Sequence, residues 1–443
     1  MNVRKLAVDA IDKIMTNNAY SNIVVNDVLN KFELSAEDRG LFTNLVYGTL
    51  QHLLTIEYYI EPFIAKKKPK HWVRYLLYMS IYQLVYLKTA DYAVVNEATS
   101  IARVKDKQIA SFVNGVLRNF LRTPLKDIEE LRNVGEVEYL SVKYSHPAWL
   151  VAFFLKDYSF DVVEKILIEN SEEKKDAIRI NTLKSSKEEV IEEFNKLGII
   201  YEENPLFIDA LIIKNKNSKE MLDLNLCKEG KIYLQSLSSQ LPAILLNPKE
   251  SCDILDMCAS PGSKTTYLAQ LVHNNSFITA CEIDKIRMER LKSNVSRLGA
   301  TCVNFMCVDS RKLDDYFRFD QILLDAPCSG SGTLSINDKS MSKFSKALVF
   351  NSSKLQFELL KKALTILKPG CEMIYSTCSI LDIENEEVVN KILKLNNCIV
   401  VPFGDEVKKY LPLLPTKIDG TLCIKPNEYF EGFYVAKIKK INK

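Results

Sequence analysis

The stretch "DILDMCASPGSKTTYLAQLV", residues 253–272, decides the class of fold. Its apolar start predicts a strand, Pro261-Gly262 predicts a tight turn, and "SKTTYLAQLV" predicts a helix. The same order continues toward the C-terminus, with strands predicted at 276–283, 302–308, 319–326 and 371–378, and helices at 284–299 and 353–367. Gly299 and Pro369-Gly370 are stop signals for these helices. The alternation predicts a mostly parallel, doubly wound α/β sheet over residues 235–443.

The residues before this sheet predict two further domains. Residues 1–125 show apolar positions at helical spacing; Ser35 is a predicted helix N-cap with an acid three places on, and residues 72–87 predict a buried helix. Residues 126–234 mix helical patterns with short strands such as "AIRINTL" and "ALIIKN". We therefore expect a multi-domain chain with an all-α domain, a small α+β linker module and an α/β domain, in that order.

Composition and cysteine usage narrow the setting in which the protein works. The 443 residues carry a net charge of +3 and contain no uncharged apolar run long enough to cross a bilayer. The N-terminus lacks the apolar core of a signal peptide, so a cytoplasmic protein without membrane attachment is expected. The eleven cysteines begin only at Cys227 and include no C-x-x-C pair, which favours reduced thiols over disulfides. The four histidines show no ligand spacing, so no metal is predicted.

Polar features follow four strands of the predicted sheet, at the edge where open α/β sheets bind ligands. They are the loop "CASPGSKT" at 258–265, Glu282, Asp309 and Asp325. A turn before a helix offers backbone N–H groups to an anion, and Glu282 lies 20 residues after Gly262 (282 − 262), close to the spacing of an acid that binds a ribose diol. Because neither G-x-G-x-x-G nor a Walker lysine motif occurs, a nucleoside cofactor without a pyrophosphate fits best. A lone acid at a strand end is more often a cap, but four in register weaken that interpretation.

Two cysteines also follow strands, in "LLDAPCSGSG" at 323–332 and "EMIYSTCSIL" at 372–381. Most cysteines are small buried hydrophobic residues, but Cys328 and Cys378 are flanked by Pro, Ser, Thr and Gly instead of core residues. A thiolate that adds to C6 of a pyrimidine makes C5 able to attack a methyl sulfonium, and a second group can assist release. Asp325 is suitably placed to stabilise such an adduct near the base N3. Which thiol attacks stays open on this reasoning, and the base must leave its stack to expose C6.

These residues resemble a known family. From about Arg179 onward the chain is similar to RNA (cytosine-C5) methyltransferases of the RsmB/Sun group, in "RIN" at 179–181, "DMCASPGSKT", "EID" at 282–284, "RLGA", "VDSR" at 308–311, "LLDAPCSGSG", "YSTCS" and "EGFYVAK". The N-terminal stretches "DRGLFTNLVYGTL" and "FVNGVLRNFLR" resemble the NusB-like helical RNA-binding domain of the RsmB branch. The resemblance covers nearly the whole chain, and the pair of PCS and TCS cysteines is its most specific part.

The resemblance implies a Rossmann-like class I methyltransferase domain that uses S-adenosyl-L-methionine on a specific cytosine of 16S ribosomal RNA. The cofactor would be held by Cys258, Ala259, Ser260, Pro261, Gly262, Ser263, Lys264, Glu282, Asp309 and Asp325. By the same resemblance Cys378 is the nucleophile, Cys328 assists product release, and Asp325 belongs to the catalytic set. Neither DNA nor a membrane is an expected partner, and a monomer is the default.

Four positions depart from the family pattern, and other functions compete with this one. Ser260 and Ser263 stand in the loop that usually reads "CAAPGGKT", Ser236 replaces an Asp, and Glu431 replaces an Asp. If position 263 needs a positive φ, the loop must adjust. A methyltransferase acting on tRNA or another rRNA site is one alternative, and a non-catalytic RNA-binding assembly factor is another. The basic stretch "AKKKPKHWVR" at 65–74 suits phosphate contacts, although a solvated loop explains it equally well.

Overall fold

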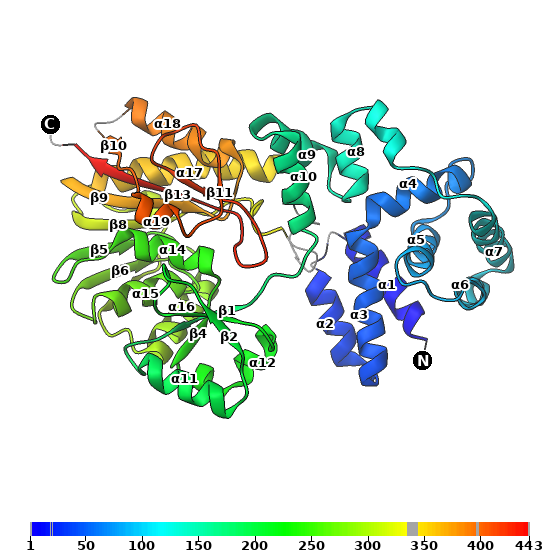
Figure 1. Ribbon diagram of the computed structural model, residues 1–443, viewed down its shortest axis with the longest axis horizontal. Helices are drawn as coiled ribbons and strands as arrows, with labels where there is room; N and C mark the ends of the chain where they lie inside the picture. Colours follow the sequence, from blue (N-terminus) through cyan, green and yellow to red (C-terminus); the bar gives the residue numbers. More distant parts are fainter. Residues whose placement is uncertain (1, 18, 20, 335–343, 396–397, 442–443) are drawn as a thin grey trace. The chain divides into compact units, whose positions relative to one another are not determined.

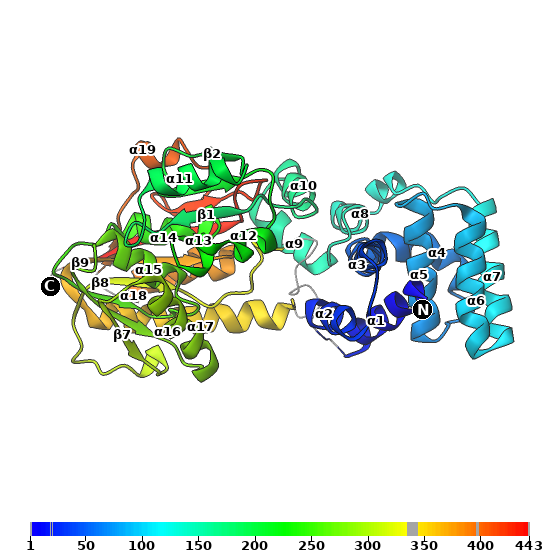
Figure 2. The same ribbon diagram turned by 90° about the horizontal axis from the view of Figure 1, so that it is seen from below.

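The computed structural model describes residues 2–17, 19, 21–334, 344–395 and 398–441 and divides into two compact units. The helical unit comprises Met1–Glu172 and Leu334–Phe344, and the sheet unit comprises Glu173–Thr333 and Ser345–Lys443 (Figures 1 and 2). Among the described helices, none combines the length and apolar character that crossing a bilayer requires.

Apolar faces at helical spacing pack the helices of residues 3–122 around one core. Ser35 caps α3, since its side chain accepts a hydrogen bond from the Asp38 backbone N–H at 3.2 Å, which confirms the predicted N-cap. Helix α5 is buried continuously from Tyr75 to Gln83, which confirms the predicted buried helix. The elements are α1 (Val3–Asn17), α2 (Ser21–Lys31), α3 (Ala36–Gln51), α4 (Leu53–Ile64), α5 (His71–Val85), α6 (Asp91–Lys105), α7 (Lys107–Arg122), the 3-10 helix η1 (Glu129–Asn133), α8 (Glu136–Lys143), α9 (Ala148–Asp157) and α10 (Phe160–Glu169).

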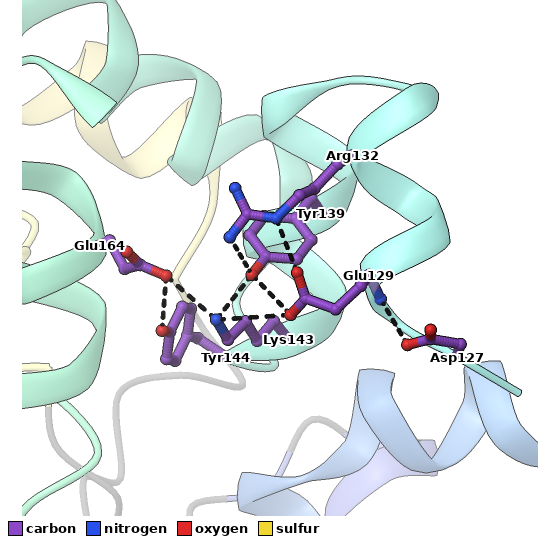
Figure 3. Close-up of polar contacts among 7 residues, drawn as sticks. All are labelled: Asp127, Glu129, Arg132, Tyr139, Lys143, Tyr144 and Glu164. Carbon is purple, nitrogen blue, oxygen red and sulfur yellow. Dashed lines mark hydrogen bonds and ion pairs between the residues drawn. The ribbon is translucent and has the colours of Figure 1, made fainter. Parts of the chain in front are cut away.

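A network of polar side chains, here called the tyrosine network, joins η1, α8 and α10 within the helical unit (Figure 3). Its members are Glu129, Arg132, Tyr139, Lys143, Tyr144 and Glu164. The buried Tyr139 hydroxyl donates to Glu129 at 2.9 Å and accepts from Arg132 at 2.7 Å and Lys143 at 2.6 Å. Glu164 in turn accepts from Lys143 and from the Tyr144 hydroxyl. Opposite charges thus meet around one phenol, and each can offset the desolvation of the other.

The sheet unit begins with a small antiparallel sheet in the order β2-β3-β1-β4. Its strands are β1 (Ala177–Ile180), β2 (Tyr201–Glu203), β3 (Ala210–Ile213) and β4 (Ile232–Leu234), and its helices are α11 (Lys187–Lys196), α12 (Ser218–Asp223) and α13 (Asn225–Lys228). This sheet is the α+β element expected before the larger sheet. The helices of 126–172 group with the helical unit instead, and the domain boundary at residue 126 stays a prediction.

The larger sheet follows the order β11-β12-β13-β9-β8-β5-β6-β7, with β10 paired to β13. Strands β9, β8, β5, β6 and β7 run parallel, and β13, β12 and β11 extend the sheet antiparallel. The predicted doubly wound fold is therefore present as a mixed sheet. Its strands are β5 (Asp253–Asp256), β6 (Phe277–Cys281), β7 (Val303–Met306), β8 (Phe319–Asp325), β9 (Leu367–Thr377), β10 (Cys398–Val400), β11 (Leu413–Leu414), β12 (Leu422–Ile424) and β13 (Phe433–Lys440).

Helices cover this sheet in two layers (Figures 1 and 2). One layer holds α14 (Leu237–Leu246), α15 (Ser263–Leu271) and α16 (Lys285–Leu298), and the other holds α17 (Lys346–Ile366) and α18 (Glu386–Leu395). The short elements η2 (Ser310–Lys312), η3 (Asp382–Glu384) and α19 (Asp405–Lys408) lie in connections. Gly299 ends α16 with a φ of 71°, which confirms the predicted stop.

The prediction that Pro369-Gly370 stops the preceding helix is confirmed, although the next strand begins earlier than the predicted residue 371. Helix α17 ends at Ile366, and β9 begins at Leu367 and includes both residues. The pairing of β8 with β9 shifts register between Phe319 and Gln321, opposite this stretch. An irregularity of this kind accommodates a proline that has no N–H to donate.

Candidate functional site

The register of β8 and β9 brings the two candidate thiols together. Asp325, the last residue of β8, lies opposite Ser376 of β9, and each strand is followed within three residues by its cysteine. The sulfur atoms of Cys328 and Cys378 are 2.9 Å apart, and both thiols are free. The sequence predicted each thiol past a strand end, and the structure brings them into one site.

Asp325 is held beside this pair by two different partners. Its Oδ1 accepts a hydrogen bond from Ser376 Oγ at 2.8 Å, and its Oδ2 lies 2.6 Å from the Lys264 ammonium. Burial lowers the pKa of Lys264, but the Asp325 carboxylate outweighs burial and raises that pKa above its ordinary value. The lysine therefore stays charged and fixes the carboxylate at the end of β8.

The surroundings of Cys328 disfavour its ionisation. The hydrogen bond with Cys378, burial and the carboxylates of Glu384 and Asp325 raise the pKa of Cys328 well above the ordinary value of a thiol. Cys328 is therefore a neutral thiol at neutral pH and can donate its S–H toward Cys378.

A cavity of about 370 Å³ opens next to the thiols. Most of the predicted cofactor and catalytic positions line it, namely Cys258, Ser260, Glu282, Asp309, Asp325, Cys328 and Cys378. A second hollow of about 450 Å³ shares Cys258, Ser260 and Asp325 with the first and is also lined by Ala259, Pro261, Ser263 and Lys264. Gly262 lines neither. The predicted site residues thus gather around two adjoining spaces that meet at Asp325.

Arginines that the sequence analysis did not single out accompany the acids of the first cavity. Arg287 lies 3.5 Å from the buried Glu282 carboxylate, whose other oxygen accepts from the Asp284 backbone N–H. Arg311 binds both oxygens of Asp309 and, with other hydrogen bonds, lowers the pKa of Asp309. Asp309 also caps η2, so the same carboxylate is a helix cap and a lining residue of the cavity. Both acids are therefore oriented acceptors.

The turn at 258–265 is shaped by Gly262 and by a buried arginine. Gly262 has a φ of 105°, and a Cβ there would lie 2.9 Å from Leu291 Cδ1. Ser263 is already the first residue of α15, so its departure from glycine needs no adjustment of the backbone. Arg179 of β1 donates to the Ser263 carbonyl at 2.7 Å and to Thr266 at 2.9 Å. The small sheet thereby supports the start of α15.

Two of the departures from the family pattern contact each other. Ser236 Oγ donates to Glu431 Oε2 at 2.6 Å, and both residues line the second hollow. The short Ser236 side chain therefore contacts Glu431, whose side chain is longer than that of the Asp usual in the family. The two residues lie 195 positions apart in sequence. Sequence reasoning treated the two changes separately because no local pattern links them.

Comparison with known proteins gives a consistent result. The NusB family matches residues 1–122, the ferredoxin-like domain of RsmF/B-like methyltransferases matches 146–219, and the family described as 16S rRNA methyltransferase RsmB/F matches 243–439. The probable ribosomal RNA small subunit methyltransferase B of Bacillus subtilis (strain 168) is 34% identical over 448 residues, which cover 99% of this chain and 98% of the relative.

Solved structures resemble the chain as well. The crystal structure of PH0851 is 26% identical, with a TM-score of 0.77 and 99% of both chains covered. A methyltransferase homolog protein from Pyrococcus horikoshii is 29% identical, with a TM-score of 0.60, and covers 68% of this chain and 98% of its own.

Proposed function

The chain belongs to the RsmB/F family of 16S rRNA methyltransferases, and from this premise we propose that it methylates C5 of a specific cytosine in 16S rRNA through a covalent bond between Cys378 and C6. The single observation that carries the chemistry is the thiol pair, with sulfurs 2.9 Å apart beside the Asp325 carboxylate. A C5 methylation needs one thiol to attack and a second group to assist release, and this arrangement supplies both.

In the proposed reaction Cys378 attacks, Asp325 stabilises the adduct and Cys328 assists release. The Cys378 thiolate adds to C6, which makes C5 nucleophilic, while Asp325 hydrogen-bonds near the base N3 and stabilises the adduct. C5 then takes the methyl group that the cofactor would supply, a water molecule accepts the C5 proton, and the electron pair left on C5 restores the C5–C6 double bond as the Cys378–C6 bond breaks and the thiolate leaves. Cys328, which its hydrogen bond with Cys378, burial and the neighbouring charges keep protonated, assists this last step by donating its S–H to the departing sulfur. That protonation state supports Cys378 as the nucleophile, because the thiolate and not the thiol attacks.

The first cavity suits S-adenosylmethionine by size and by chemistry. Its volume of about 370 Å³ lies in the range of small-molecule sites. Glu282 and Asp309 offer carboxylate acceptors for the hydroxyl and amino groups of a nucleoside, and Asp325 offers a negative charge toward a sulfonium. When bound, S-adenosylmethionine supplies an electrophilic methyl group. Lys264 and the turn at 258–263 line the adjoining space, where an anionic end of the cofactor fits.

The helical unit supplies a surface that suits the RNA backbone. Lys67, Lys68 and Lys70 line a hollow of about 330 Å³ together with Phe112 from α7. The Lys67 ammonium lies 5.6 Å from the Phe112 ring centre, and the Lys105 ammonium lies 4.2 Å from that of Trp72. Lysines beside partly exposed aromatic rings offer contacts to phosphates and stacked bases, which supports RNA as the partner.

The test is methyl transfer from labelled S-adenosylmethionine to deproteinised, unmodified 16S rRNA, with the labelled atom located by mass spectrometry. We expect label at C5 of one cytosine, no label with Cys378→Ala, and normal label with Cys371→Ala, a matched half-buried thiol in the strand that precedes Cys378. Turnover by Cys378→Ala, or label on another atom, contradicts the mechanism. Label on tRNA alone contradicts the substrate.

The second thiol has its own test. Cys328→Ala impairs release in the proposed reaction, so the variant is expected to accumulate a protein–RNA adduct that survives denaturing gel electrophoresis. Cys328→Ala/Cys378→Ala is the control and forms no adduct. Absence of adduct in the single variant, under conditions where wild type turns over, contradicts the role given to Cys328.

A further inference from the structure

We propose that Glu384 is a positioning residue for methyl transfer, because its carboxylate fastens the two thiol loops to each other. The proposal rests on the function given above and adds a residue that the reaction scheme does not use. Glu384 is the last residue of η3, and its side chain is fully buried. Glu384 lines neither of the two cavities. It therefore affects methyl transfer only through the loops that carry Cys328 and Cys378.

The contacts of Glu384 reach the residue after each thiol. Oε1 accepts a hydrogen bond from the Ser329 backbone N–H at 2.8 Å, and Oε2 accepts from the Ser379 hydroxyl at 2.7 Å. The Ser329 hydroxyl also donates to Oε2. Ser329 follows Cys328 directly and Ser379 follows Cys378 directly. One carboxylate therefore sets the separation of the two backbones that carry the sulfur atoms.

A glutamine completes the arrangement from the helix layer. Gln356 of α17 donates from Nε2 to the Pro327 carbonyl at 2.9 Å and to Glu384 Oε1 at 3.3 Å. Pro327 directly precedes Cys328, so the first thiol is anchored on both sides. Ser331 and Ser379 are also hydrogen-bonded, at 2.8 Å between their oxygens, which joins the two loops a second time. We call Glu384, Ser329, Ser379 and Gln356 the thiol-loop network.

The location of the carboxylate points to function more than to folding. The groups that donate to Glu384 are neutral hydroxyl, amide and backbone groups, and burial raises its pKa. A buried carboxylate with neutral partners is a costly way to join two loops. Its charge also disfavours ionisation of Cys328, which keeps that thiol protonated for release.

The expected effects follow from geometry. Glu384→Ala frees both loops, and a displacement of about 1 Å at reacting atoms lowers the rate of methyl transfer about 100-fold. The KM for either substrate is expected to change little, since no contact to substrate is removed. Glu384→Gln is expected to retain most of the rate, because its amide oxygen can accept from Ser329 N–H and its NH₂ can donate to the serine hydroxyls.

A second readout measures the thiol geometry without methyl transfer. Diamide removes two electrons and two protons from a pair of neighbouring thiols and joins them as a disulfide. With sulfurs 2.9 Å apart, the wild-type chain is expected to form the Cys328–Cys378 disulfide readily, as quantified by peptide mass spectrometry. In Glu384→Ala the loops no longer hold the two sulfurs together, so the disulfide is expected to form at least about 10-fold more slowly. In Glu384→Gln it is expected to form at the wild-type rate.

Glu386→Ala is the matched control. Glu386 is also a buried glutamate, two residues further on, but it accepts from the backbone N–H groups of Lys417 and Ile418 and not from the thiol loops. Its loss is expected to affect stability while disulfide formation stays at the wild-type rate. A wild-type disulfide rate in Glu384→Ala, or equal slowing in Glu386→Ala, overturns the proposal. Because disulfide formation needs no RNA, it tests the role of Glu384 in the thiol-loop network separately from the proposed methyltransferase function.

Discussion

Each unit of the molecule has one conspicuous polar network, and the two networks are built differently. In the helical unit, the tyrosine network pairs Glu129 with Arg132 and Glu164 with Lys143 around the Tyr139 hydroxyl. In the sheet unit, the thiol-loop network surrounds one buried carboxylate with neutral donors. Charges are compensated locally in the first network, whereas in the second the charge is held only by hydrogen bonds.

The difference separates stability from function. A compensated network at a helix junction contributes to stability and places no demand on chemistry. The sheet unit instead concentrates buried or mostly buried ionisable groups with raised pKa values, among them Asp256, Lys264 and Glu384, near the carboxyl ends of its strands. Ionisable groups with perturbed pKa values in this position mark sites of function, even though they reduce stability. Four predictions test this contrast.

The largest effect is expected at Asp325. Asp325→Ala removes the stabilising carboxylate and leaves Lys264 buried without its partner, so methyl transfer falls by about 10³-fold and the sheet unit loses about 3–5 kcal/mol. Asp325→Ala/Lys264→Met is expected to regain stability and not activity. Since all eleven cysteines lie in the sheet unit, thiol exposure in urea measures its unfolding. Recovery of activity in the double variant would show that the ion pair acts only structurally.

In the helical unit, substitution of Tyr139 is expected to affect stability alone. Tyr139→Ala deletes a fully buried ring and should cost about 3–5 kcal/mol. Tyr139→Phe keeps the ring and removes hydrogen bonds to side chains that water can still reach, at about 0.5–1.5 kcal/mol. Both tryptophans, Trp72 and Trp149, lie in this unit, so their fluorescence in urea reports its unfolding. A phenylalanine variant as stable as wild type would mean that the network contributes nothing.

One carboxyl group in each unit, Asp256 and Glu164, is expected to make stability respond to pH in opposite directions. Burial raises the pKa of Asp256 to about 6 in the folded protein, so its contribution to stability is present below about pH 4 and is lost between pH 4 and 6. The loss is about 3 kcal/mol, and Asp256→Asn should remove this pH dependence.

Glu164 gives the contrast in the helical unit. Burial raises the pKa of Glu164, but hydrogen bonds from Tyr144 and Lys143 outweigh burial and lower it, so its contribution is lost as the pH falls. Urea unfolding between pH 4 and 7, followed by tryptophan fluorescence and by 4,4′-dithiodipyridine, separates the two responses. Parallel pH profiles for the two probes would contradict the prediction.

The smallest effect is expected at the Ser236–Glu431 contact. Ser236→Ala removes one hydrogen bond and should cost about 1 kcal/mol. Ser236→Asp restores the residue usual in the family but places a carboxylate against Glu431, which is expected to destabilise the sheet unit further. Ser236→Asp/Glu431→Asp tests whether the two departures compensate each other. A double variant no less stable than the serine form would show that they do not.

The sequence by itself determined the order of elements, the class of fold and the family. Alternating strand and helix patterns, the N-cap at Ser35 and the stop at Gly299 are local signals, because each depends on residues a few places apart. The positions of Cys328, Cys378 and Asp325 past strand ends were predictable for the same reason. The start of β9 at Leu367, before Pro369-Gly370, was not predicted, since the pairing of β8 with β9, and not local preference, governs that stretch.

Only the tertiary structure decided which side chains meet. The ion pair of Lys264 with Asp325, the contact of Ser236 with Glu431 and the reach of Glu384 to both thiol loops join residues far apart in sequence. Each depends on the register of β8 against β9 and on the helices packed over them, which is a property of the whole sheet. Local patterns therefore predicted the thiols at strand ends. The assembled sheet brings their sulfurs to 2.9 Å from each other, with the Glu384 carboxylate bound to the loops that carry them.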